Sequence, residues 1–505
     1  MALAPQKTFY WRAVGLISGA MFLALCWHYT AYLNLWGDEA LSLLYAGQGW
    51  GARPVDVHLP TYYWGLGAVL AVWGDSSERL LRLLHALTFG CGLGFGLLTV
   101  RRTFGHTRLV VPVAALVVTL PSYLFYATNL RMYAPLFLAS MAFIDAVSQI
   151  LVTGKSPPWW LQLWLVVSGT ALVCTDYAAG LYYAAGLLML ALHAIAHKTL
   201  KVLMVAAMPG VLAVGLALGT LGNLREIQNW DMAAYQGSTW TGPVDLAKGL
   251  YLACRPVLDL IHQAPLPIPL ALGLPLVLVG LLLWAAGVLF TQAHQRFGPV
   301  HWVLLLALLW VPFIPTGFGF TRLFLPSQFF MIVVIVWWVG QGKTWRHWGG
   351  RLVVGLWLAI NLAAALHPIP RFYSLVPYPT VAADVADYAH QHNIHRVLVG
   401  NNSLNTLAFE HYLQALGAAP QLQTERVDGV ALAQVVAEHP TEPFIFISHQ
   451  GENGVFIDVT TLPSGQSQLI QGYVPLAHLP YNRLWNQRYG EGAGQPYIVQ
   501  TYRLN

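Results

Sequence analysis

The stretch Asn34–Gly49, NLWGDEALSLLYAGQG, decides how the rest of the sequence is interpreted. A long apolar run, Tyr10–Leu33, precedes it, and two adjacent acids, Asp38 and Glu39, stand near its start. Charged residues make up only 9% of the chain, against about 25% in globular proteins. One interpretation of the two acids is a helix start, where carboxylates favour the helix dipole by less than about 1 kcal/mol each. The other interpretation is catalysis at the boundary between membrane and water.

The composition indicates a polytopic α-helical membrane protein. The chain has 505 residues, of which 56% are hydrophobic, and its mean hydropathy is +0.54. Apolar runs of about 20 residues, the length that crosses a bilayer, recur along it. The net charge of +5 is carried in short loops between these runs, so a nucleic-acid partner is not expected. The four cysteines are scattered without a CxxC motif, which argues against a disulfide framework and against a zinc site.

Lysine and arginine in short loops set the orientation, because such loops stay in the cytoplasm. Lys7 and Arg12 place the N-terminus inside, so Asp38 and Glu39 lie on the external face. The run His58–Gly74 is short for a span and is predicted to be a juxtamembrane or re-entrant helix on that face. Eleven spans follow from this scheme: Tyr10–Leu33, Arg79–Val100, Val110–Thr128, Ala134–Val152, Trp159–Thr175, Ala178–Ile195, Val202–Leu221, Leu270–Phe290, Val300–Phe313, Leu323–Gly340 and Leu352–Leu366.

The chain is predicted to contain two domains. Residues 1–370 form a transmembrane catalytic domain, and residues 371–505 form a small soluble α/β domain on the external side. Strands that alternate with helices favour some parallel pairing. No GxGxxG motif follows a predicted strand, so a nucleotide site is not expected. The predicted elements are helices at Thr380–Gln391, Ser403–Leu416 and Val430–Glu438 and strands at Arg396–Gly400 and Phe444–Ser448.

The external ends of the spans collect charged and polar side chains. Cations on this face run against the positive-inside bias, so each needs an anionic partner. Arg131 and Arg322 stand where a short loop meets an apolar run, and a guanidinium fork there suits a lipid phosphate. The alternative is that these side chains snorkel to the interface or form a structural pair with a local acid. The full set comprises Asp38, Glu39, His58, Arg79, Arg82, Arg131, Tyr133, Asp176, Tyr177 and Arg322.

Other polar residues have simpler interpretations beside the functional ones. Asp176 ends a span and could be a helix-end cap, and His58 could bond a substrate or be solvated at the interface. Asp145 lies inside a span, where an acid is a functional candidate by default, but the sequence names no partner for it. There is no Asp-x-Asp motif or histidine cluster, so we expect no metal site and no obligatory cofactor.

Six segments, in order along the chain, resemble the GT-C glycosyltransferases of the protein O-mannosyltransferase and aminoarabinose-transferase type. This sequence has Leu59 where the first proline of one motif usually stands, and Asp176 in place of a histidine. The segments are WGDEALSLLYAGQG, HLPTYYW, SSERLLRLLHAL, NLRMYAPLFL, CTDYAAGLYY and TRLFLPS.

The resemblance implies a GT-C-like membrane glycosyltransferase, with external juxtamembrane helices, in a bacterial inner membrane. It would move a sugar from a polyprenyl-phosphate donor to a lipid, glycan or protein acceptor at the external, periplasmic face. We expect an inverting displacement with Asp38 as base and Glu39 in a positioning role. The donor phosphate would be held by Arg131, Arg322 and Arg82, and the substrates by His58, Tyr62, Tyr133, Asp176 and Tyr177.

The alternative function is a transporter or flippase of a lipid-linked sugar. Such a protein would carry polar residues near the bilayer midplane and an inverted repeat. Asp145 is the one strong charge predicted within a span, and no repeat is visible in the sequence.

Overall fold

The computed structural model divides the chain into two compact units. The first comprises Met1–Thr30, Gly51–Gly65 and Ala71–Pro368, and the second comprises Ala31–Trp50, Leu66–Leu70 and Ile369–Asn505. The residues that the structure describes are 5–31, 33, 35, 37–48, 59, 61–73, 78–105, 107–153, 157–176, 179–197, 201–212, 214–215, 257, 260, 268–292, 298–312, 321–340, 345–366, 378–400, 403–418, 421–427, 444–450, 456–462 and 468–473.

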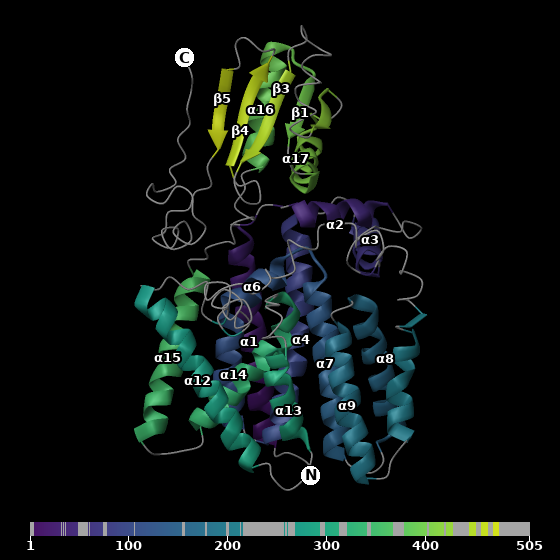
Figure 1. Cartoon of the computed structure of the whole chain (residues 1–505), viewed down its shortest axis with the longest axis vertical. Coiled ribbons are helices and arrows are strands. Elements are labelled where there is room, and N and C mark those ends of the chain that lie inside the picture. The colour runs from purple at the N-terminus through teal and green to yellow at the C-terminus, as the bar shows by residue number, and fades with distance from the viewer. Residues whose placement is uncertain are drawn as a thin grey trace, which may run out of the picture. The chain divides into compact units, whose positions relative to one another are not determined.

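The first unit is a bundle of apolar helices (Figure 1). Among the described residues, six helices are long and apolar enough to cross a membrane, or up to seven if one bent pair is a single span. Four shorter apolar helices lie at four more of the predicted spans. The chain is therefore a polytopic helical membrane protein, as predicted. The helices are α1 (Pro5–Thr30), α4 (Glu78–Phe104), α5 (Thr107–Thr119), α6 (Pro121–Thr128), α7 (Tyr133–Thr153), α8 (Trp159–Thr175), α9 (Ala179–His197), α12 (Ile268–Gln292), α13 (Pro299–Leu308), α14 (Leu325–Gly340) and α15 (Trp345–Leu366), with a 3-10 turn η3 at Thr321–Phe324.

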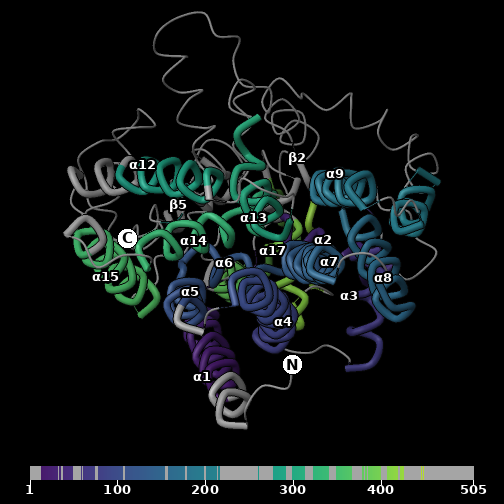
Figure 2. Tube along the Cα trace, turned by 90° about the horizontal axis from the view of Figure 1, so that it is seen from below, coloured from purple at the N-terminus to yellow at the C-terminus, as the bar shows by residue number. Residues whose placement is uncertain are grey.

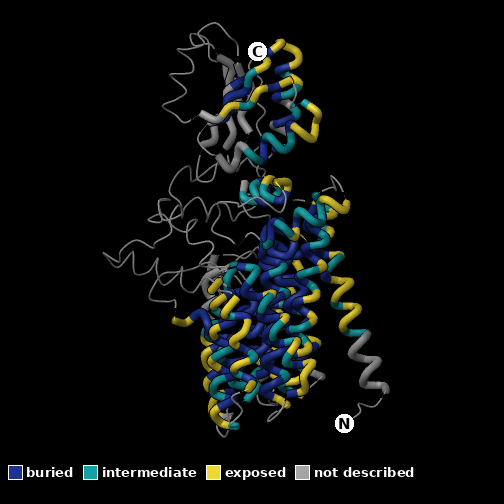
Figure 3. The backbone as a smooth tube through the Cα atoms, turned by 90° about the vertical axis from the view of Figure 1, so that its right-hand side faces the viewer, coloured by how far each residue is buried: buried dark blue, intermediate teal, exposed yellow. Residues whose placement is uncertain are grey.

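Helices α4 and α7 pack side by side in the bundle (Figure 2). A Cβ atom added at Gly92 of α4 would lie 2.7 Å from the Phe137 ring and 3.1 Å from the Leu138 Cα of α7, so glycine permits this close approach. Helices α7 and α14 are buried along most of their length, as expected for helices that are apolar all round. Large apolar side chains of α1, such as Leu16 and Ile17, are exposed, and Figure 3 marks part of the N-terminal helix as exposed. In a membrane, such outward side chains face lipid.

The predicted span Val110–Thr128 is broken in the structure. Helices α5 and α6 meet at an angle of 60°. Pro121 stands at the start of α6, and Leu120 before it is extended, with φ −67° and ψ 116°. Proline disfavours the helical conformation in the residue that precedes it and is well placed at the first turn of a new helix. The predicted span therefore consists of two helices at an angle, which together are long and apolar enough to be one broken span.

Two short helices follow α1. Helix α2 covers Gly37–Gly47 and carries Asp38 and Glu39 in its first turn. Helix α3 covers Thr61–Trp73, and thirteen residues at about 1.5 Å each reach only about 20 Å, less than a bilayer core. Helix α2 belongs wholly to the second unit, whereas α3 contributes Leu66–Leu70 to that unit.

The rest of the second unit is an α/β domain built on a five-stranded sheet of order β2-β1-β3-β4-β5. Strand β1 pairs parallel with β2 and β3, and the other pairs are antiparallel. Two predicted helices and two predicted strands are confirmed, and β2, β4 and β5 were not predicted. The predicted helix Val430–Glu438 lies outside the described residues. The elements are α16 (Tyr378–His392), β1 (Arg396–Gly400), α17 (Ser403–Ala415), β2 (Gln423–Val427), β3 (Phe444–Gln450), β4 (Phe456–Leu462) and β5 (Gln468–Tyr473).

Candidate active site

Arg82 points from the first turns of α4 toward the end of α6. Its side chain is 2% exposed, and its Nη1 donates a hydrogen bond to the carbonyl oxygen of Thr128 at 2.9 Å. Glu78, one turn earlier on α4, lies 4.0 Å from the same guanidinium group. Thr128 is the last residue of α6. Arg82 is thus fixed where α6 ends.

Arg131 lies in the short turn that joins α6 to α7. The turn begins because Asn129 is extended, with φ −79° and ψ 131°, and α7 begins at Tyr133. Arg131 is 3% exposed and Asn129 is 1% exposed. The polar side chains of this turn are therefore enclosed by the bundle.

Arg322 approaches the same turn from η3. Its Nη1 donates to the hydroxyl oxygen of Tyr133 at 2.8 Å, and its guanidinium carbon lies 5.7 Å from the centre of the Tyr133 ring. Tyr133 stands two residues after Arg131. All three predicted phosphate-binding arginines therefore converge on the segment Thr128–Tyr133, which we call the arginine turn.

The arginine turn is suited to an anion. Guanidinium groups stay protonated, so three positive charges gather around six residues. Two of the three side chains are almost fully buried, and like charges repel more strongly where the effective dielectric is low. A phosphate group matches both the charge and the fork geometry of these donors. The arrangement can stabilise a bound or a departing phosphate.

A second set of contacts connects this region to α3 and α8. The hydroxyl group of Tyr62 lies 3.1 Å from Nε2 of His85, and Nδ1 of His85 lies 2.9 Å from the carbonyl oxygen of Leu81. A carbonyl oxygen can only accept, so Nδ1 carries the proton and Tyr62 donates to Nε2. His85 lies one turn after Arg82 on α4. Tyr62 is thereby held beside the helix that carries Arg82.

Asp176 lies at the C-terminal end of α8, beside the start of α3. The residue is 4% exposed and has an extended backbone, with φ −161° and ψ 152°. Two residues earlier, the carbonyl oxygen of Cys174 accepts a hydrogen bond from the hydroxyl group of Thr61. Thr61 precedes Tyr62 on α3. Contacts thus run from the end of α8 through α3 and α4 to the arginine turn.

Sequence reasoning missed His85. It lies three residues after Arg82, and residues at that spacing share one face of a helix. A search for polar residues on the face of the predicted span that carries Arg82 would have found it.

The two acids of α2 belong to a different compact unit from the other described candidate residues. Asp38 is partly exposed and Glu39 is 1% exposed. The hydroxyl group of Ser42 donates to the carbonyl oxygen of Asp38 at 2.9 Å. Both acids belong to the second unit. The first unit holds Arg82, Arg131, Arg322, Tyr62, Tyr133 and Asp176, and His58 and Tyr177 lie outside the described residues.

Asp145, for which the sequence named no partner, is paired inside the bundle. It forms an ion pair with Arg102 of α4. It also accepts hydrogen bonds from Thr99 at 3.1 Å and from Gln149 at 2.7 Å. These contacts account for its burial and indicate a structural role in joining α4 to α7.

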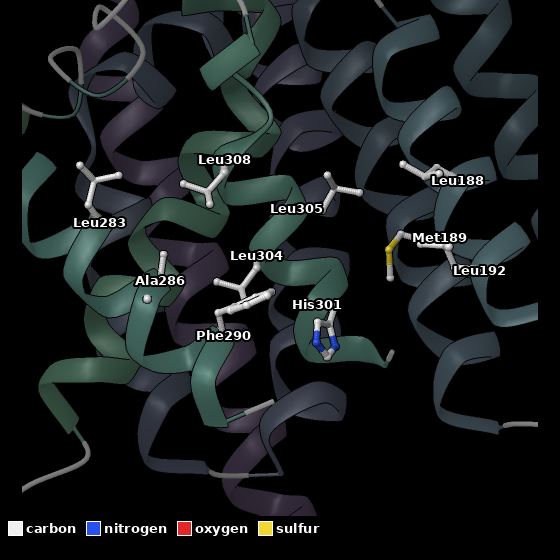
Figure 4. Close-up of a pocket in the computed structure, with 11 residues that line it drawn as sticks. Leu188, Met189, Leu192, Leu283, Ala286, Phe290, His301, Leu304, Leu305 and Leu308 are labelled. Carbon is white, nitrogen blue, oxygen red and sulfur yellow. The ribbon is translucent and has the colours of Figure 1, made fainter. Parts of the chain in front are cut away.

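A cavity of about 520 Å³ lies among α9, α12 and α13 (Figure 4). Its lining is apolar apart from His301, and none of the predicted site residues lines it. It therefore lacks the groups that sugar transfer requires. Within the described part of the chain, no three His, Cys, Asp or Glu side chains are grouped closely enough to hold a metal ion.

Comparison with known proteins identifies the fold. The chain is similar to the crystal structure of ArnT from Cupriavidus metallidurans bound to undecaprenyl phosphate, with a TM-score of 0.51 and 14% sequence identity. The match covers 88% of this chain and 94% of that one. No protein-family model matches the chain, and no curated protein matches it by sequence. The structural match shows that the chain shares the fold of ArnT, as the resemblance predicted.

Proposed function

We propose, from the GT-C fold that this chain shares with ArnT, that the protein is a membrane glycosyltransferase whose donor is a sugar on a polyprenyl phosphate. The observation that carries the proposal is the convergence of Arg82, Arg131 and Arg322 on one turn. That arrangement is suited to a phosphate, and the ArnT structure contains undecaprenyl phosphate.

The proposed reaction is an inverting displacement at the anomeric carbon. The bond between that carbon and the phosphate oxygen breaks, and its electron pair leaves with the phosphate. The arginines stabilise the charge that develops on this leaving group. Asp38 takes the proton of the acceptor hydroxyl group as that oxygen forms the new bond. Glu39, which is buried beside it, helps to position the acceptor or Asp38 itself.

The protein lies in a bacterial inner membrane with Asp38 on the periplasmic face, and the acceptor is a lipid, a glycan or a protein. Tyr62, Tyr133 and Asp176 contribute to substrate binding, with His58 and Tyr177 as further candidates from the sequence. No divalent metal is obligatory, so transfer is expected to survive complete chelation with EDTA.

The test uses the purified full-length protein in nanodiscs with radiolabelled undecaprenyl-phosphate pentoses and hexoses and candidate acceptors. Wild-type protein should form a covalent product, and Asp38→Asn should lower kcat by at least a hundredfold because the variant lacks the base. Glu410→Gln, which changes an acid on α17, serves as the control and should retain activity. Near-normal turnover by Asp38→Asn would exclude Asp38 as the base.

The same substrates distinguish the transporter alternative. In sealed proteoliposomes, a transporter would move the labelled lipid between leaflets without altering it, whereas a transferase releases polyprenyl phosphate and a glycosylated acceptor. Translocation without a covalent product would overturn the proposed function.

A further inference from the structure

The acidic helix α2 is part of the C-terminal domain's compact unit. Contacts assign Ala31–Trp50 to the same unit as Ile369–Asn505, although more than 300 residues separate them in sequence. Ala40, next to Glu39, is 4% exposed and belongs to one apolar core with residues of α16, α17, β1 and β3. Helix α2 therefore supplies part of the hydrophobic core of this domain.

Helix α17 holds the start of α2 by a specific hydrogen bond. The backbone N–H of Leu35, two residues before the helix, donates to the hydroxyl oxygen of Tyr412 at 2.8 Å. Leu35 is 0% exposed, and the neighbour of Tyr412, Leu413, is 1% exposed in the shared core. Figure 1 shows α2 beside α17. The bond fixes the backbone three residues before Asp38.

Helix α3 restrains the other end of α2. A Cβ atom added at Gly67 would lie 2.6 Å from the carbonyl oxygen of Ala46, which is a backbone atom and cannot turn aside. Gly67 and Ala46 both belong to the second unit. The helix that bears Asp38 and Glu39 is thus held at its start by α17 and near its end by α3.

We propose that the C-terminal domain positions the acidic pair, and that Tyr412 is a positioning residue that acts through Leu35 and α2. The role of the pair in transfer rests on the proposed function, whereas the hold on α2 does not. A catalytic group displaced by about 1 Å can lose about a hundredfold in rate, so a domain that fixes the entry to α2 controls kcat. Donor binding, assigned to the arginine turn of the first unit, should be unaffected.

The test removes one hydroxyl group with Tyr412→Phe. In full-length protein in nanodiscs, amide hydrogen exchange of residues 35–44 should become about five times faster, as expected for one lost hydrogen bond, while exchange in α16 and β1 stays unchanged. In transfer assays kcat should fall about tenfold with an unchanged KM for the undecaprenyl-phosphate sugar. The matched control is Tyr388→Phe on α16, whose ring stacks on His392 with centroids 3.9 Å apart; it should behave as wild type.

A second pair of variants tests the restraint from α3 independently. Gly67→Ala should raise exchange in residues 35–44 and lower kcat in the same way, because the added methyl group meets the Ala46 carbonyl. Gly65→Ala, where nothing lies within 4 Å of the added carbon, should change neither quantity.

The exchange rates test whether the domain holds α2, and the kinetic constants test whether that hold positions the acidic pair for transfer. Unchanged exchange in Tyr412→Phe and Gly67→Ala would show that the domain does not hold α2. Faster exchange with a raised donor KM and an unchanged kcat would overturn the positioning role. If the wild-type protein transfers no sugar, the proposed function fails, and the exchange experiment still decides whether the domain holds the helix.

Discussion

At the scale of single residues, the arginine turn brings together three positive charges that are far apart in the sequence. Arg82, Arg131 and Arg322 stand on three elements separated by as many as 240 positions, and each could be chosen from the sequence because external cations oppose the positive-inside bias. Their convergence could not be predicted, because it depends on how α4, the turn between α6 and α7, and η3 pack. The contact between His85 and Tyr62 could not be predicted for the same reason, although His85 itself shares a helix face with Arg82 in the sequence.

The arginine turn leads to a prediction about phosphate binding. Arg131→Met should weaken binding of undecaprenyl phosphate at least tenfold, because a charge-assisted contact to a phosphate is worth about 1.5–3 kcal/mol. Isothermal titration of the protein in nanodiscs measures the affinity. Arg79→Met is the control: that arginine lies over the Trp27 ring, 3.5 Å from its centre, and its loss should leave the affinity unchanged. Equal loss in both variants would indicate a general charge effect instead of a site.

At the scale of elements, the contact between α4 and α7 depends on which glycine faces the neighbouring helix. Gly92 and Gly96 are buried four residues apart on one face of α4, whereas Gly94 is exposed between them. The sequence CGLGFG does not say which of these glycines is required. The structure shows that Gly92 is required for this contact and Gly94 is not, because a Cβ atom at Gly94 would meet nothing within 4 Å.

This contrast predicts opposite behaviour for two neighbouring substitutions. Gly92→Ala should lower stability by about 1–3 kcal/mol, since the methyl group is forced against Phe137 and the Leu138 backbone. Gly94→Ala should cause no loss, because alanine favours a helix more than glycine does. Thermal unfolding of the two variants in the same detergent compares them. A Gly94→Ala variant less stable than Gly92→Ala would contradict the packing described.

The elements that could be predicted are marked by apolar runs, whereas the elements that were missed are not. The spans Ala134–Val152 and Trp159–Thr175 were predicted to within one residue at each end because apolar length alone defines them. Strand β2, QTERV, is polar and lies at an edge of the sheet, so no hydrophobic run marks it. It forms because its backbone pairs with β1. The break at Pro121 was overlooked because the apolar run continues through it.

At the scale of the whole molecule, the sequence indicated two domains but not their membership. Hydropathy changes near residue 370, and the compact units divide there, between Pro368 and Ile369. The prediction placed Asp38 and Glu39 in the transmembrane domain, and the contacts assign them to the other unit. A pairing between segments this distant in sequence leaves no trace in composition, charge or periodicity.

The proposed orientation predicts which parts of the chain are reachable from outside the cell. In a variant without native cysteines, Gln414→Cys on the exposed face of α17 should react with a membrane-impermeant maleimide in intact spheroplasts. Lys155→Cys, in a loop that the charge bias places inside, should react only after lysis. Mass shift on a gel reports both reactions. Labelling of Lys155→Cys in intact spheroplasts would show that the orientation is the opposite of the one proposed.

The contact between Leu35 and Tyr412 also sets an order of events during synthesis. The two residues are 377 positions apart, and translation at about 5–20 residues per second separates them by roughly 20–75 s. For most of that interval α2 lacks the larger part of its final core, which α16, α17, β1 and β3 supply. The acidic helix therefore matures last among the elements of the candidate site, after the membrane helices that carry the arginines have been made. A nascent or prematurely terminated chain that ends before α17 would carry the arginine turn without the contact that orders α2, so under the proposed function it would transfer no sugar.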